Sequence, residues 1–183
     1  MSGDRYKIAN QNATYFLTLT VVDWVDLFTR KDYCFVLTDS LNYCAKEKGL
    51  IVYAYVIMSS HVHLVCSVKE PFKLSHVLRD LKKHTSKQFV KIMDKIGESR
   101  KEWLLNKFSF EARRTQRADN YKIWKDDNHA IEIGEYIDIE QKINYIHENP
   151  VKAMLVREQT DYIFSSALDY ANGQGNVKIT KAY

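Results

Sequence analysis

The chain has 183 residues, of which 45% are hydrophobic and 27% are charged, and its formal net charge is +4 at pH 7. This length fits a single domain with a full hydrophobic core. The chain has no run of about 18 apolar residues and its polar start lacks the apolar region of a signal peptide, which argues against a transmembrane or secreted protein. We therefore expect a cytoplasmic protein without a membrane partner. Its three cysteines form no C-x-x-C pair and predict reduced thiols in the core.

The first half of the chain predicts a strand, a helix and a hairpin. In residues 14–22 leucines alternate with threonines, which is typical of a strand with one buried face. Residues 32–48 fit a helix that ends at Gly49. Residues 50–58 are apolar on both faces and predict a central strand. Ser59-Ser60 then turn the chain into another strand, which should pair with residues 50–58 in an antiparallel hairpin.

The next part of the chain predicts a long helix and then irregular structure. Residues 73–93 carry apolar side chains at helical spacing, with the lysines largely on the other side. Residues 97–107 are charged and poorly periodic, which predicts a connection. Short extended pieces are expected near residues 108–113, 120–124 and 129–133.

The last predicted helix covers residues 138–149, because an isoleucine stripe ends at Pro150, which a helix interior does not tolerate. The order strand, helix, strand, strand, helix, strand predicts an α+β fold of the ferredoxin-like, split βαβ type, with an antiparallel sheet and helices packed on one face. We expect one domain over residues 1–171, followed by a flexible link and C-terminal tail over residues 172–183.

A pair of histidines is the most distinctive local feature. His61 and His63 are separated by one aliphatic residue, so on a strand both side chains point to the same face, while Val62 and Leu64 face the core. Two imidazoles at that spacing can share a divalent cation. One histidine can equally be a hydrogen-bonded residue at a sheet edge, so the pair alone does not decide between the two interpretations.

Tyr145 and Asn149 are four residues apart on the last predicted helix and therefore lie on one face. If this face opposes the histidine strand, Asn149 supplies a third, oxygen ligand and Tyr145 stands beside the metal as a nucleophile. The alternative is that Asn149 only precedes a proline at a helix end and that Tyr145 is one of many tyrosines.

Basic residues gather in two clusters that could contact phosphates, and the alternative is that they merely solvate helix faces. The candidate DNA-binding residues are Lys82, Lys83, Lys87, Arg113, Arg114 and Arg117.

Four stretches together resemble a known family. They are SSHVHLVCS (59–67), LRDLKKHTS (78–86), YIHENPVKAMLV (145–156) and YIFSSALDY (162–170). Their joint occurrence resembles the single-tyrosine HUH transposases, and especially the REP-associated tyrosine transposases of the IS200-like group. The resemblance covers most of the chain, from about Tyr15 to Tyr170.

The resemblance implies an HUH endonuclease-like fold and a DNA nicking and strand-transfer activity in DNA transposition and recombination. It implies that His61 and His63 bind Mg²⁺ or Mn²⁺ and that Tyr145 attacks DNA to form a 5′-phosphotyrosyl link. Many relatives have glutamine four residues after the tyrosine, where this chain has Asn149. His147 and Glu148 are nearby alternatives for the third ligand.

The implied partner is single-stranded or hairpin DNA, such as a REP palindrome, for a nucleoid-associated protein. Some relatives form homodimers that share active sites, so both a monomer and a homodimer remain open. Two other functions are compatible with the sequence. One is a transposase-derived regulator that binds hairpin DNA without cutting it. The other is an RNA-binding ferredoxin-like module in which Tyr53 and Tyr55 stack on bases.

Overall fold

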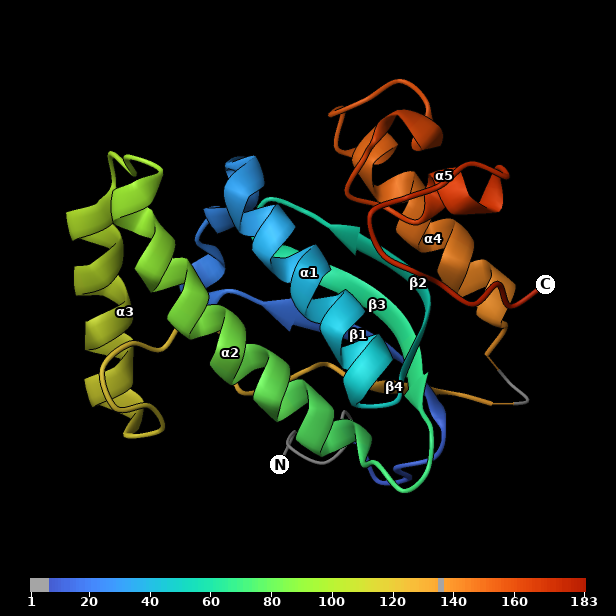
Figure 1. Cartoon of the computed structure of the whole chain (residues 1–183), viewed down its shortest axis with the longest axis horizontal. Helices are drawn as coiled ribbons and strands as arrows, with labels where there is room; N and C mark the ends of the chain where they lie inside the picture. Colours follow the sequence, from blue (N-terminus) through green and yellow to red (C-terminus); the bar gives the residue numbers. More distant parts are fainter. Residues whose placement is uncertain (1–6, 135–136) are drawn as a thin grey trace.

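A computed structural model describes residues 7–134 and 137–183 and places a four-stranded antiparallel sheet at the centre of the molecule (Figure 1). Its strands are β1 (Thr14–Thr20), β2 (Leu50–Ile57), β3 (His61–Val68) and β4 (Ile131–Ile133), in the order β2-β3-β1-β4. Helix α1 (Lys31–Glu47) connects β1 to β2, and helix α2 (Leu74–Lys95) follows β3. The ferredoxin-like fold expected from the sequence is confirmed.

Two helices cover one face of the sheet, and a third packs on the other. Helices α1 and α2 lie side by side across the sheet (Figure 1), where strand residues such as Leu17 and Leu64 are buried with them in the main core. Helix α4 (Ile139–Lys152) places Ile143 and Ile146 in a second buried cluster, together with Val65 of β3. This second cluster lies on the same sheet face as the histidines, because side chains of β3 alternate between faces.

Helix α3 (Lys101–Thr115) replaces the connection and the extended piece that were expected at residues 97–107 and 108–113. Gly97, with φ of +60°, ends the preceding helix, and the chain then turns into α3. Leu104 and Phe108, four residues apart, are fully buried on its inner side. The sequence prediction was wrong here because the buried stripe is narrow and the rest of the helix surface mixes charged residues with the exposed rings of Trp103 and Phe110.

Helix α4 does not stop at Asn149 as expected but continues to Lys152, with Pro150 inside its last turn. A proline in a helix lacks one N–H group, so it loses the hydrogen bond to the carbonyl four residues earlier. The neighbouring bonds persist, since the Ala153 N–H donates to the Asn149 carbonyl at 2.9 Å and the Leu155 N–H donates to the Pro150 carbonyl at 2.9 Å. The loss is confined to the end of the helix.

The C-terminal segment, expected as a flexible link and tail at residues 172–183, packs on the domain. Val177 is buried, the Thr180 N–H donates to the Val52 carbonyl at 2.8 Å, and the Lys178 N–H donates to the Asn42 side chain at 2.8 Å. Strand β2, expected to be central, lies instead at the edge of the sheet, so its outer carbonyl groups are free to accept such bonds. The short elements are η1 (Val22–Trp24), η2 (Leu27–Thr29), η3 (Gln159–Asp161) and α5 (Ala167–Tyr170).

All three cysteines are buried and free, as expected. Among the described residues, no helix is both long enough and apolar enough to cross a membrane.

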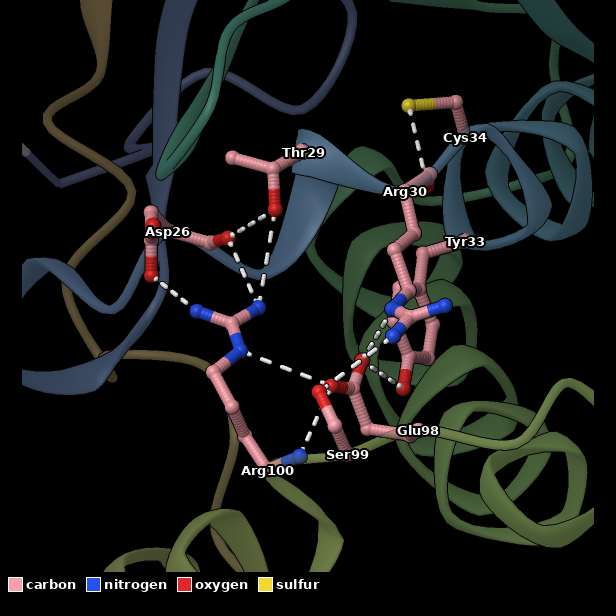
Figure 2. A network of polar contacts seen from close by, with 8 residues as sticks. All are labelled: Asp26, Thr29, Arg30, Tyr33, Cys34, Glu98, Ser99 and Arg100. Atoms are coloured by element: carbon pink, nitrogen blue, oxygen red, sulfur yellow. Dashed lines mark hydrogen bonds and ion pairs between the residues drawn. The ribbon is translucent and has the colours of Figure 1, made fainter.

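A buried carboxylate joins α2, α3 and the start of α1 (Figure 2). Glu98 accepts hydrogen bonds from the Tyr33 hydroxyl at 3.1 Å and from the backbone N–H of Arg100 at 3.1 Å, and it pairs with Arg30 at 3.0 Å. Arg100 also reaches Asp26 at 2.6 Å. Burial alone would raise the pKa of Glu98, but these hydrogen bonds and the two arginine charges lower its pKa overall.

We predict that Glu98→Ala lowers the free energy of unfolding by about 1–3 kcal/mol, because it leaves the buried Tyr33 hydroxyl without its partner. The difference from wild type should shrink as the pH falls below about 4.5, since a carboxyl with a lowered folded-state pKa stabilises only while ionised. Urea denaturation at several pH values measures this. The exposed Glu102→Ala on α3 is the control, and equal losses in both variants would contradict the prediction.

Candidate active site

The two histidines of β3 lie together on the sheet face that α4 partly covers. Register pairs Thr20 of β1 with His61 and Thr18 with His63. The imidazole centroids are 4.7 Å apart and the ring planes cross at 75°. His63 is buried and His61 is half-buried. The strand therefore brings the two side chains to one point, as the H-x-H spacing predicts.

A hydroxyl group forms a hydrogen bond with the Nδ1 atom of each ring. The Thr18 hydroxyl lies 3.0 Å from Nδ1 of His63, and the Ser60 hydroxyl lies 3.3 Å from Nδ1 of His61. A hydrogen bond at Nδ1 leaves Nε2 as the nitrogen for a ligand, and such bonds also hold the ring in place.

Both imidazoles are neutral at pH 7. Burial, together with the nearby His61 and His129, lowers the pKa of His63 to about 3. Burial also lowers the pKa of His61. Neutral imidazole is the form that binds a metal, so the two rings are suited to that role.

Tyr145 of α4 lies against His63 in the same chain. The ring centroids are 5.3 Å apart, and Phe16 of β1 contacts both rings, stacking on His63 at 5.3 Å and meeting Tyr145 edge-on at 5.8 Å. The flanking Ile143 and Ile146 are fully buried against the sheet, which fixes this part of the helix. Tyr145 nevertheless remains 42% exposed, so part of this side chain is open to a large substrate.

Asn149 lies one helical turn beyond Tyr145 and is half-buried. Its amide nitrogen donates to the Tyr145 carbonyl at 2.7 Å, so its oxygen is the atom available for a ligand. The two alternatives fit less well. His147 is buried and bonds through Nε2 to the Ser166 hydroxyl at 2.9 Å, and Glu148 pairs with Lys152 at 2.6 Å.

Within residues 7–134 and 137–183, no three His, Cys, Asp or Glu side chains are grouped so that they could hold a metal. Two neutral imidazoles and one amide oxygen are a donor set of mixed type that accepts Mn²⁺ or Mg²⁺. A metal site built on His61 and His63 would therefore need an oxygen donor of another kind.

The sequence analysis did not select several residues of this cluster. Phe16, Thr18 and Ser60 contact the three main side chains, and Lys142 places its ammonium 5.1 Å from the Phe16 ring centroid. The alternation in residues 14–22 already puts Thr18 on the face opposite the core. Only the strand register shows that this face meets His63.

The candidate DNA-binding residues lie in two parts of the chain, the lysines on α2 and the arginines around the end of α3. Lys83 and Lys87 line a groove between α1 and α2 with a volume of about 770 Å³, on the sheet face opposite the histidines. Lys82 is half-buried and donates to the Lys125 carbonyl at 2.7 Å, and burial lowers its pKa to about 8.

The three arginines lie at and just beyond the end of α3. Arg113 donates to the Ser109 hydroxyl at 3.4 Å, and Arg114 pairs with Glu111 at 2.8 Å. Arg117 pairs with Asp126 at 3.1 Å. All three are exposed.

The fold and this cluster define a ferredoxin-like domain with imidazoles and an exposed phenol gathered on one sheet face. The family model described as "Transposase IS200 like" matches residues 11–114, more than half of the chain. The chain therefore belongs to the IS200-like transposases. The matched region contains His61 and His63 and ends before Tyr145.

A solved structure of a REP-associated tyrosine transposase bound to a REP hairpin is similar over 94% of this chain and 88% of that chain. Its TM-score is 0.59 and its sequence identity is 17%. At this identity the similarity supports the fold. A search among curated proteins finds no match.

We predict that His61→Ala and His63→Ala each weaken Mn²⁺ binding by at least about tenfold, because each removes one imidazole donor. Both proteins should still fold, since the apolar face of β3 is unchanged. Isothermal titration calorimetry measures the affinity and circular dichroism checks the fold. The exposed His84→Ala on α2 is the matched control. Wild-type affinity in either histidine variant of β3 would remove that residue from the metal site.

Proposed function

We propose that this protein is a metal-dependent single-strand DNA endonuclease and strand transferase that cuts near DNA hairpins or palindromic repeats through a 5′-phosphotyrosyl intermediate. The observation that carries the proposal is that the exposed Tyr145 ring lies beside the His63 ring of the same chain. The two ring centroids are 5.3 Å apart. Family membership supports DNA as the substrate, and the hairpin bound by the similar solved structure supports hairpin DNA as the partner.

The proposed reaction is an exchange of phosphodiester bonds. The Tyr145 oxygen attacks the scissile phosphorus and loses its proton to solvent, while the bond from phosphorus to the 3′ oxygen breaks and that oxygen takes up a proton. The products are a 5′-phosphotyrosyl link and a free 3′-hydroxyl. Because the number of phosphodiester bonds is unchanged, a 3′-hydroxyl can reverse the step on the same or another strand without a nucleotide cofactor.

Side chains around the tyrosine meet the needs of this step. His61, His63 and the Asn149 oxygen would hold Mg²⁺ or Mn²⁺, which supplies Lewis-acid stabilisation of the charge on the phosphate. The ammonium of Lys142, above the Phe16 ring, adds positive charge on the same side of the sheet. The Phe16 ring fixes the distance between phenol and imidazole.

The RNA-binding alternative loses its main support, because Tyr55 is fully buried and cannot stack on a base. Tyr53 is half-buried and hydrogen-bonds to Ser67 at 3.1 Å. A regulator that binds hairpins without cutting them is distinguished by the following experiment.

We predict that Tyr145→Phe abolishes the covalent adduct while leaving the fold and hairpin binding intact, because the change removes one oxygen and almost no volume. The protein is incubated with Mn²⁺ and a set of single-stranded hairpin oligonucleotides labelled 3′ of the cut, and adducts are separated on a denaturing gel. The control is Tyr43→Phe, an exposed tyrosine of α1. An adduct of wild-type intensity with Tyr145→Phe would place the nucleophile elsewhere. Binding without an adduct by the wild-type protein would support the regulator.

We predict that Lys83→Ala and Arg113→Ala each weaken hairpin binding about equally for all sequences, because contacts to phosphates carry affinity rather than base identity. The slope of log affinity against log salt should become shallower by about 0.7–0.9 for each phosphate contact removed. Fluorescence anisotropy at four salt concentrations measures the slope, with Lys46→Ala on α1 as control. An unchanged slope would show that the altered residue only solvates its helix.

A further inference from the structure

An exposed tryptophan stands directly beside the histidine pair. Trp24 ends the short helix η1 that follows β1, and 57% of its surface is exposed. The edge-on contact between its ring and the His61 ring has a centroid distance of 5.5 Å and an interplanar angle of 77°. Because the ring is exposed and lies against His61, it is available to a substrate that enters the candidate site.

The backbone at this tryptophan is held in an unfavourable conformation. Asp23 and Trp24 are consecutive non-glycine residues with φ of 51° and 56°, in the left-handed region. This conformation costs roughly 1–2 kcal/mol for each such residue. Strain of this kind persists only where the surrounding structure imposes it, and it is common at functional sites.

Hydrogen bonds on both sides impose the turn. The Val21 N–H donates to the Ser60 carbonyl at 3.0 Å, and the Phe28 N–H donates to the Ser59 carbonyl at 2.9 Å. The Val22 N–H donates to the Ile123 carbonyl at 2.8 Å. The turn is thus tied to the residues that directly precede His61, and the indole is presented at a fixed place relative to the histidines.

One ammonium group lies over the ring. The ammonium of Lys125 lies 4.8 Å from the Trp24 ring centroid, and the Lys125 N–H donates to the Thr20 carbonyl at 2.8 Å, which anchors this lysine beside β1. Lys107 of α3 pairs with Asp23 at 2.8 Å. An exposed indole with an ammonium group beside it is suited to single-stranded nucleic acid, whose bases stack on aromatic rings and whose phosphates pair with cations.

We propose that Trp24 is the stacking platform for an unpaired base next to the scissile phosphate, and that Lys125 contacts the adjoining phosphate. This inference rests on the proposed function, in which single-stranded DNA enters the histidine site. Every base has a flat face, so the platform accepts any base and holds the strand near His61 without reading its sequence.

The test uses a fluorescein-labelled single strand of fifteen thymidines and a labelled blunt duplex of the same length. Binding is measured by anisotropy in EDTA, so that no cleavage occurs. Trp24→Ala should weaken binding of the single strand by about 5–150-fold, the range that corresponds to one stacked base. Trp24→Phe should retain most of the affinity, because a phenyl ring also stacks. Binding of the duplex should not change, because its bases are paired.

The control is Trp103→Ala, which removes the exposed tryptophan of α3, and it should bind the single strand as wild type does. A direct readout of stacking is the quenching of tryptophan fluorescence by the oligonucleotide. Quenching should occur in the wild type and in Trp103→Ala and be lost in Trp24→Ala. Circular dichroism verifies that each variant is folded.

Three results would overturn the inference. They are wild-type affinity of Trp24→Ala for the single strand, an equal loss for single strand and duplex, and no binding of the single strand by the wild type. The proposed function is tested separately by adduct formation. Binding that depends on Trp24 without any adduct would keep Trp24 as a stacking platform for single-stranded DNA and refute the cleavage reaction. An adduct together with unchanged binding of the single strand by Trp24→Ala would support the proposed enzyme and refute this inference.

Discussion

The packing of α4 on the second face of the sheet is the contact on which the site depends. Ile143 and Ile146 are fully buried with Val65 and Phe16, and this burial sets the rotation of the helix. Tyr145 lies between these two isoleucines in sequence and points to the side where His63 stands. A helix rotated by one residue position would turn its phenol away from the imidazoles.

Burial also sets the chemistry of the histidines. The same low-polarity surroundings that hold Phe16 against His63 lower the pKa of that imidazole, so the ring stays neutral over the physiological range. Hydroxyls from Thr18 and Ser60 then provide partners for the Nδ1 atoms. Packing, hydrogen bonding and protonation state all favour two adjacent neutral rings, with a phenol beside that of His63.

Much of the fold was predictable from periodicity, because strands and helices with one clearly buried face leave a strong pattern. The paired histidines and the face shared by Tyr145 and Asn149 were predictable for the same reason. Helix α3 was missed because its buried stripe is narrow, and the end of α4 was misplaced because a proline near a helix terminus removes one bond without ending the helix.

Other parts of the site depend on contacts between segments far apart in the chain. The sequence does not show that Thr18 pairs with His63 or that Trp24 stands against His61, since both follow from strand register and from the turn after β1. The docking of the C-terminal segment depends on the exposed edge of β2.

The central claim is that one chain assembles the whole site, with Tyr145 acting beside its own histidines. Mixing the His63→Ala protein with the Tyr145→Phe protein tests it most directly, in the covalent adduct assay with Mn²⁺ and hairpin DNA. The mixture should give no adduct although the wild type does, because neither chain contains both groups. An adduct in the mixture would show that the tyrosine of one chain works with the histidines of another and would contradict the account.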